Sequence, residues 1–523
     1  MKKFIAMLLV MLSVVSIFAG CGPVSTGPVG SGLDMSDEAP YEVDPVTGQF
    51  IYGDTFKDVT VEWWISSNYD LSSDMFLFKK LEEVVGCKIN LVCYGSEVFA
   101  AKINTALNTN NLPDMCTLGV SKEVYNVYGE QGAFVNLLSD AALSRLPNLK
   151  KNVLDVPGVA ELIEGQKSTS GALYAMPRYN TERLVNHGWM YREDIFEKHG
   201  IEMWHDSESF LDVLRQLKQL YPKSYPLTGA DMNTMFNRVI YNYGVNSTTM
   251  AYDWDKKEWV MGAASEAYYE MLCLFQTAWN EGLVDPDIFA NGTNDIDSAI
   301  LNDESFVFNS WIGRMAEQNP AGKDKDPNFQ VSYAPHIGSG VGNQLSVLSS
   351  TGVLINAQST SAEACLAIWN YLYSEEGTFA CTVGEEGVTY KLNEDGTKCY
   401  LNDDGTEMER PTIQSLEEQF GLWNAAIYPM ASRESVYYVY SPEEAEAQEI
   451  GSQGGLASGA PTARIPEEYG EEYYDLAHNL TMDIQQFSAK FIAEGYDRAT
   501  WESAIQTWNT KYGRVFELLN GNY

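Results

Sequence analysis

The 523-residue chain has few groups that could bind a metal ion or carry out covalent catalysis. Its five histidines are scattered at positions 187, 199, 205, 336 and 478, without the spacing of a metal site. No P-loop, GxSxG, HExxH or dinucleotide-binding glycine motif occurs in a fitting context. We therefore expect no cofactor, no metal ion and no catalytic residue, and we predict that the protein is not an enzyme.

Positive charge is scarce as well. The chain has 34 Lys and Arg against 72 Asp and Glu, which gives a formal net charge of −38. Dense negative charge repels phosphate backbones, so nucleic acid is excluded as a natural partner. The Asp-Gly pairs at 395–396 and 404–405 lack the other ligands of a calcium loop, and so does the segment 221–227.

The eight cysteines contain no CxxC pair. Cys87 and Cys93 fall on one predicted strand, which separates them by about 20 Å, far beyond the reach of a disulfide. Apart from Cys21, we predict that most of these side chains are buried free thiols. Such thiols suit an exported protein from a reducing habitat.

Only one long apolar run occurs, at residues 4–18. Its length of about 15 residues is too short to span a bilayer, and its two preceding lysines indicate a secretory signal over residues 1–20. The sequence FAGC ending at Cys21 resembles the lipobox of bacterial lipoproteins, with Phe18 in place of the usual Leu. The resemblance implies that Cys21 carries a lipid on the extracytoplasmic face of the cell membrane. Ordinary secretion, with Cys21 as an incidental thiol, is the alternative.

About 500 residues follow the signal, too many for one compact core. Residues 21–55 are rich in Gly, Pro, Ser and Asp and predict a flexible tether. After it, apolar patterns predict strands near 59–65, 88–94 and 115–118 and helices near 77–85 and 98–108. This alternation predicts an α/β fold with a mainly parallel sheet and ligands at the strand ends.

Farther along, one helix is predicted to begin at a cap formed by Asp206 or Ser207, and a second one is predicted over 476–491 and ends at Gly495. Trp254 and Trp259 flank a predicted surface hairpin turn. The acidic and glycine-rich residues 441–470 predict a long solvated loop.

Several segments in shared order resemble family 1 extracellular solute-binding proteins, in particular lipoproteins of oligosaccharide importers. They are LPDM at 112–115, YGEQGAFVNL at 128–137, GALYAMP at 171–177, YRED at 191–194, NEGLVDP at 280–286, SEEG at 374–377 and GEEGVTY at 384–390. Each motif alone is weak, but their order over roughly residues 58–520 is specific.

The resemblance implies a two-lobe periplasmic-binding-protein-like fold, with an interlobe hinge and a ligand cleft. By analogy, residues 56–178 and 350–400 form lobe 1, and residues 179–349 and 401–523 form lobe 2. The implied partners are a carbohydrate ligand and the transmembrane permease subunits of an ABC transporter, and the expected state is a monomer.

Sugars present apolar C–H faces that aromatic rings bury, and hydroxyls that polar side chains satisfy. Resemblance and position together select candidate ligand-binding residues at strand ends and crossings: Trp64, Ser66, Asn68, Tyr179, Asp231, Asn233, Trp311, Arg314 and Trp423. Trp311, in the segment NSWIGR, is the main candidate for stacking on a sugar. For Trp311 and for Trp423, which we place on a lobe 2 helix, a core position is the alternative.

The sequence is compatible with three other functions. The same fold could bind another solute such as a peptide, the chain could be a surface glycoside hydrolase or esterase lipoprotein, or it could bind another protein as an adhesin or sensor.

Overall fold

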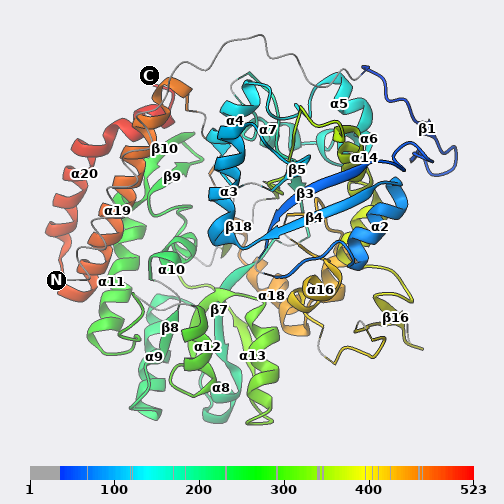
Figure 1. The fold of residues 1–523 in the computed structure, drawn as a ribbon. Coiled ribbons are helices and arrows are strands. Elements are labelled where there is room, and N and C mark those ends of the chain that lie inside the picture. Colours follow the sequence, from blue (N-terminus) through cyan, green and yellow to red (C-terminus); the bar gives the residue numbers. More distant parts are fainter. Residues whose placement is uncertain are drawn as a thin grey trace, which may run out of the picture.

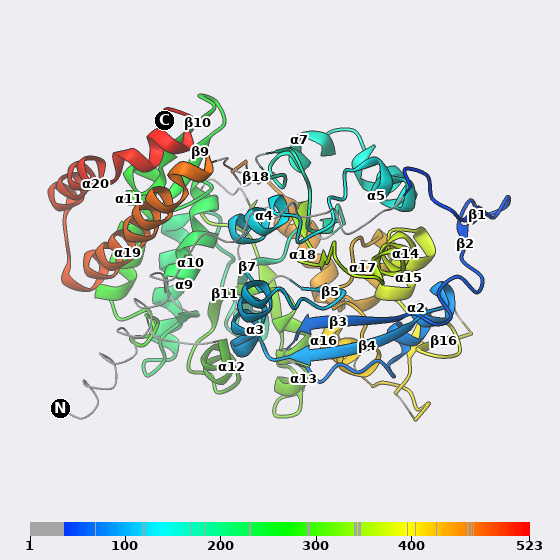
Figure 2. The ribbon, with the colours of Figure 1, turned by 45° about the horizontal axis from the view of Figure 1, so that its top comes forward.

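The computed structural model describes residues 36–523 except 68, 118, 121, 169, 183, 230–231, 290–292, 339–341, 344–346, 395, 403, 410, 425, 458–459, 462 and 464. The predicted signal, Cys21, Asn68 and Asp231 therefore lie outside the described residues. The chain forms two α/β lobes, seen side by side in Figures 1 and 2.

The first lobe is built on a four-stranded sheet in the order β15-β5-β3-β4. Its strands are β3 (Thr60–Ser66), β4 (Lys88–Tyr94), β5 (Met115–Cys116) and β15 (Leu354–Ile355). Strand β3 pairs in parallel with β4 and β5, whereas β15 pairs antiparallel to β5. Alternation along β3 buries Trp63 and Ile65 completely and leaves Trp64 half-buried.

Helices surround this sheet. They are α2 (Phe76–Val85), α3 (Ser96–Thr109), α4 (Lys122–Glu130), α5 (Asp140–Arg145), α6 (Pro147–Leu149), α7 (Val159–Glu164), α14 (Ala362–Leu372) and α15 (Glu375–Thr382). The prediction for residues 77–85 is confirmed, and Gly86 ends α2 in the left-handed conformation with φ 80°. Every residue of α14 except Glu363 is buried, so this helix forms the centre of the lobe.

The mainly parallel sheet expected from the first strands is confirmed in the first lobe, whereas the second lobe has a mixed sheet in the order β12-β7-β11-β8. Its strands are β7 (His187–Arg192), β8 (Leu227–Gly229), β11 (Val307–Trp311) and β12 (Val331–Ala334). Strands β8, β11 and β12 run in one direction, and β7, which lies between β11 and β12, runs antiparallel to both of its neighbours.

The helices of this lobe are α8 (Glu193–His199), α9 (Ser207–Leu220), α10 (Met232–Val239), α11 (Glu266–Asn280), α12 (Thr293–Leu301), α13 (Arg314–Lys323), α19 (Gly470–Glu494) and α20 (Arg498–Leu519). The predicted helix start is confirmed, because the Asp206 carboxylate accepts the backbone N–H of Ser209 at 2.8 Å. Helix α19 ends at Gly495 as predicted. Helices α19 and α20 pack together along one flank of the lobe (Figure 1).

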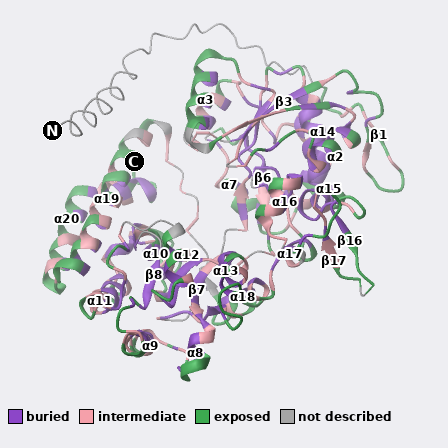
Figure 3. Ribbon diagram, turned by 60° about the horizontal axis from the view of Figure 1, so that its bottom comes forward, coloured by how far each residue is buried: buried purple, intermediate pink, exposed green. Residues whose placement is uncertain are grey.

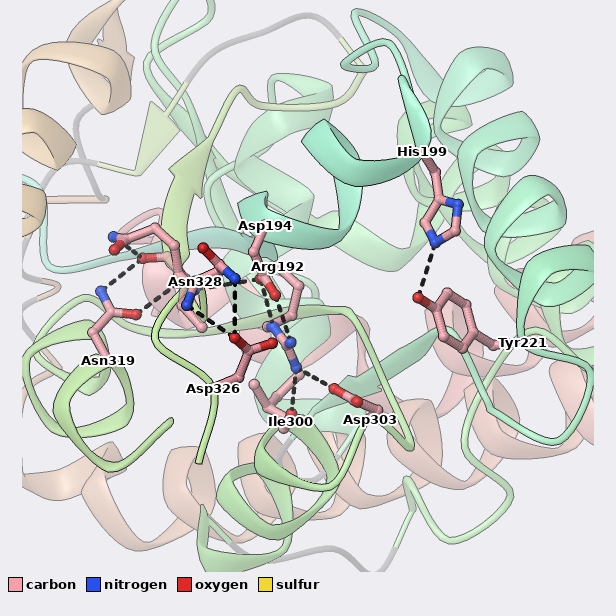
Figure 4. Close-up of polar contacts among 11 residues, drawn as sticks. Arg192, Asp194, His199, Tyr221, Ile300, Asp303, Asn319, Asp326 and Asn328 are labelled. Carbon is pink, nitrogen blue, oxygen red and sulfur yellow. Dashed lines mark hydrogen bonds and ion pairs between the residues drawn. The ribbon is translucent and has the colours of Figure 1, made fainter. Parts of the chain in front are cut away.

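A polar cluster locks the far end of β7 to the rest of the second lobe (Figure 4). The buried Arg192 guanidinium donates two hydrogen bonds to Asp194, each 2.7 Å long, and also binds Asp303 and the Ile300 carbonyl. Such bidentate pairs fix geometry strongly. This part of the YRED segment thus has a structural role, five residues along the strand from the end that meets the first lobe.

The segment 401–439 lies elsewhere than expected. Helices α16 (Ile413–Phe420) and α17 (Arg433–Val439) stand beside α2 and α15 of the first lobe (Figure 2), and α17 contacts α15. Gly421, just after α16, lies against Phe78 of α2, and the backbone N–H of Trp423 donates to the Cys381 carbonyl of α15 at 2.9 Å. The assignment of this segment to lobe 2 is therefore wrong, because its apolar side chains complete the first core.

The predicted loop at 441–470 is wrong in its first part. Residues 442–452 form α18 (Pro442–Ser452), which packs on β12 and α13. Ser441 and Glu444 make a reciprocal capping box, so the buried Glu444 carboxylate is engaged at the helix start.

The tether prediction also fails for residues 36–55. The hairpin of β1 (Glu42–Val43) and β2 (Phe50–Ile51) leads to buried Tyr52 and Phe56 in the first core. Arg145, 2% exposed, binds Glu363 and donates to the Ser36 carbonyl at 2.8 Å. Residues 36–56 are therefore docked on the first lobe; Figure 3 shows that the hairpin itself remains exposed.

The remaining short elements join or decorate the lobes. They are the paired strands β6 (Pro177–Tyr179) with β14 (Leu348–Ser350), β9 (Met250–Asp253) with β10 (Glu258–Met261), β13 (Gly342–Asn343) with β18 (Leu456–Ala457) and β16 (Tyr390–Leu392) with β17 (Lys398–Tyr400). The predicted surface hairpin between Trp254 and Trp259 is confirmed by β9 and β10. Seven cysteines of the described part are free thiols, and Cys87, Cys116, Cys365 and Cys381 are buried.

Candidate functional site

The lobes are joined where β6 and β14 pair antiparallel. Tyr179, the last residue of β6, also donates its backbone N–H to the Pro429 carbonyl at 2.9 Å. Arg178 stacks over the Tyr428 ring at 4.5 Å and donates to the Tyr428 carbonyl. Three distant segments therefore meet at the crossing, and half-buried Tyr179 lies among them.

Strands β3 and β4 point their carboxyl ends toward the second lobe (Figure 2). At this end, the Trp64 indole N–H donates to Glu62 at 2.7 Å, and its ring meets Tyr94 edge-on at 5.4 Å. Ser66 ends the strand, and its backbone N–H binds the Thr117 hydroxyl. Half-buried Trp64 and Ser66 thus lie at the strand end that faces the other lobe.

On the second lobe, Trp311 is the last residue of β11 and lies opposite His187 of β7. It is half-buried, and its ring lies directly over Gly313, where a Cβ atom would stand 2.4 Å from the indole. Any larger residue at 313 would displace the ring, so glycine is required for this close approach. The ring is neither a fully enclosed core side chain nor a freely exposed one.

Arg314 follows at the start of α13 and is 8% exposed. Its guanidinium binds Asp297 at 2.6 Å and Ser310 at 3.1 Å, while Gln318 donates to the same aspartate. These contacts hold the start of α13 against α12. Arg314 is therefore a positioning side chain whose charge is already paired.

Electrostatic coupling shows that the two lobes approach each other near these residues. Burial raises the pKa of Tyr69 after β3, and the carboxylates of Glu417, Glu418 and Glu317 raise it further. Glu317 belongs to α13, whereas Glu417 belongs to α16. The loop after β3 is thus within electrostatic reach of both lobes.

Two of these carboxyl groups have perturbed protonation. Burial raises the pKa of Glu417, although a 2.7 Å hydrogen bond from Asn424 opposes the shift. Desolvation also raises the pKa of Glu317, even though the residue as a whole is exposed. Both groups are therefore easier to protonate than ordinary glutamates.

Arg238 of α10 is a further charged residue, and it lies near Arg314 at the start of α13. Burial and the neighbouring Arg314 lower its pKa, and it forms no ion pair with the described residues. Arg238, Tyr69, Glu317 and Glu417 were not predicted from the sequence. Only their closeness to one another in space marks these four residues, and one sequence on its own does not reveal it.

The other candidates are placed differently. Asn233 is half-buried on α10, close to Arg238 along the helix. Trp423 does not lie on a helix of the second lobe: it follows α16, is 3% exposed and packs edge-on against Tyr428 in the first core. The structure therefore favours the core alternative for Trp423.

Among the described residues, no helix is long and apolar enough to cross a membrane, and no group of His, Cys, Asp and Glu is arranged to hold a metal ion.

The sequence model of the bacterial extracellular solute-binding protein family matches residues 77–382. The chain belongs to this family. The membership expected from the ordered motifs is confirmed, and the two-lobe fold agrees with it. A search of curated proteins found no match.

Several solved structures share the fold of this solute-binding protein. An alginate-binding protein crystallised without calcium ion has a TM-score of 0.68 at 16% identity, over 89% of this chain and 98% of its own. FusA, an ABC-transporter substrate-binding protein of S. pneumoniae in complex with kestose, has a TM-score of 0.67 at 18% identity. The match covers 88% of this chain and 97% of FusA. An HMO-binding, ABC-transporter-associated solute-binding protein of Bifidobacterium longum infantis has a TM-score of 0.69 at 15% identity. The match covers 88% of this chain and 98% of that protein. At these identities, the likeness shows the fold.

Proposed function

We propose that the protein is an extracytoplasmic solute-binding lipoprotein that captures an oligosaccharide and delivers it to the permease subunits of an ABC transporter. The observation that carries this proposal is Trp311, a half-buried ring at the carboxyl end of β11 where the lobes meet. The sugar-binding proteins of the same fold support the choice of ligand.

In this proposal the ligand lies between the lobes. Trp311 and Trp64 offer ring faces from opposite sides, and aromatic rings cover the apolar faces of sugars. Ser66, Tyr179, Asn233 and Arg238 offer polar groups for hydroxyls, and Arg238 forms no ion pair with the described residues. Closure about the β6–β14 crossing would then bury the sugar from both sides.

A thermal-shift screen tests the ligand class. The panel contains glucan, fructan, galactan and mannan oligosaccharides, with peptides as the rival class. A ligand that binds only the folded state stabilises it by about 2.7 kcal/mol at 100 times Kd. We expect one carbohydrate class to raise the melting temperature. A shift with peptides and none with any sugar would replace the proposed ligand by a peptide.

A glycoside hydrolase is the second candidate, because two carboxyl groups with raised pKa, those of Glu317 and Glu417, lie near the meeting point of the lobes. The hits of the screen are incubated with the protein and analysed by chromatography. We expect saturable binding and intact sugar. Product formation that Glu317→Gln abolishes would assign a hydrolase instead.

Cys21 is the proposed lipid attachment residue. Its replacement by alanine removes the thiol that would be acylated, so Cys21→Ala should release the protein from the membrane into the medium. Cell fractionation and blotting measure this, with Cys87→Ala as the matched control because that thiol is buried in the first core. Retention of Cys21→Ala with the membrane would refute the anchor.

A further inference from the structure

We propose that the second lobe carries a separate carbohydrate-binding site, formed between the β9–β10 hairpin and α20, that stacks a glycan chain on Trp254. This inference rests on the proposed function. None of the residues that line this hairpin site belongs to β3, β11 or α13, so it is distinct from the region where the lobes meet.

The hairpin is held rigidly over the helix. Tyr252 and Trp259 face each other in its register. The side chain of Asn246 pairs with both backbone polar groups of Tyr252, at 2.9 and 3.0 Å. The side chain of Asn520, just after α20, pairs in the same way with the backbone of Trp259, at 2.8 and 3.0 Å. The two strands are thus fixed on both sides by asparagine side chains.

Three aromatic rings form the wall of the site. Tyr252 meets Trp254 at 4.9 Å and Trp259 at 5.5 Å, both edge-on. Trp254 is 54% exposed, and its indole N–H forms no hydrogen bond with the described part of the chain. Tryptophan buries apolar area and offers a donor at once, so the exposed Trp254 indole, packed edge-on against Tyr252, is a stacking surface.

Helix α20 provides the floor. Gly513 lies in this helix, and a Cβ atom at that position would meet no atom within 4 Å. Asn509, one turn earlier, is exposed, and its amide has no partner among the described residues. Glycine inside a helix is less favourable than alanine. Its presence here leaves open space beneath the hairpin.

Together these elements line a cavity of about 1020 Å³ that is open to solvent on one side. This volume is near the upper end of the range for small-molecule sites, roughly 300–1,000 Å³. Its lining mixes the rings with the polar side chains of Asp253, Asp255, Lys256 and Asn509. Apolar ring faces beside amide, carboxylate and ammonium groups match the alternating C–H faces and hydroxyls of a sugar chain.

In Figures 1 and 2, the hairpin stands on the border of the second lobe that is nearer α4 of the first lobe. A long glycan held there would be close to the meeting point of the lobes. The hairpin site would then raise the local concentration of sugar chains for the main site.

Affinity electrophoresis in gels containing soluble glucan, fructan, galactan or mannan tests the proposal. Wild type and Trp311→Ala should both be retarded by at least one polysaccharide. Trp254→Ala should weaken that retardation about tenfold, and Trp254→Tyr should restore much of it.

Gly513→Trp fills the cavity while the sequence of the hairpin stays unchanged, and it should act like Trp254→Ala. Gly513→Ala is the matched control. The control should keep full retardation and melt no lower than wild type, because alanine favours the helix. Equal retardation of all variants, or retardation in none of the gels, would overturn the site. The proposed function is judged independently, by the thermal shift with short oligosaccharides.

Discussion

Replacement of Trp311 by alanine should weaken oligosaccharide binding by about 2–4 kcal/mol, the range of buried aromatic hot spots. The half-buried ring covers Gly313 at the end of β11, so its removal takes away one stacking face but little core packing. We therefore expect unfolding in denaturant to change much less than binding. Titration calorimetry with the sugar found in the screen measures the loss.

Gly313→Ala is a second test of the role of Trp311. The added methyl group would displace the indole, since no Cβ fits at 2.4 Å from the ring. This variant keeps the tryptophan but moves it, and it should lose a substantial part of the affinity. A Trp311→Ala protein that is poorly folded, but whose native fraction binds the sugar normally, would reject the stacking role.

Trp423→Ala should instead lower the free energy of unfolding by about 3–5 kcal/mol, the usual cost of truncating a large buried ring. Trp423 is 3% exposed and packs with Tyr428 in the first core. Its indole N–H is buried without a hydrogen-bond partner in the described structure. Trp423→Phe should therefore be milder, because it keeps a ring and removes an unsatisfied donor.

Urea unfolding followed by fluorescence and circular dichroism measures both variants. Sugar affinity, normalised to the folded fraction, should stay close to that of wild type. Near-normal stability of Trp423→Ala together with a large loss of affinity would return this residue to the ligand site.

Local patterns predicted much of the fold. The apolar spacing of α2, the cap of α9 at Asp206 and the stop of α19 at Gly495 are properties of adjacent residues, so the sequence alone reveals them. The family motifs, read in order, predicted the two lobes.

The errors share a physical cause, which is that the deciding contacts are distant in sequence. Segment 401–439 has no local feature that tells which core it completes. The glutamates near 444 predict a solvated loop. In the structure, Glu444 caps the start of α18 and is buried. The residues Tyr69, Glu317 and Glu417 likewise come together only through the approach of two lobes.

The docking of residues 36–56 on the first lobe determines how a membrane anchor would act mechanically. With Arg145 holding the Ser36 carbonyl, any pull from Cys21 would be transmitted to the first lobe. Fifteen residues span at most about 50 Å, so the anchor would allow the first lobe no greater distance than this from the lipid. The second lobe would carry none of this force. It alone would therefore move between open and closed positions, while the first lobe stayed in place.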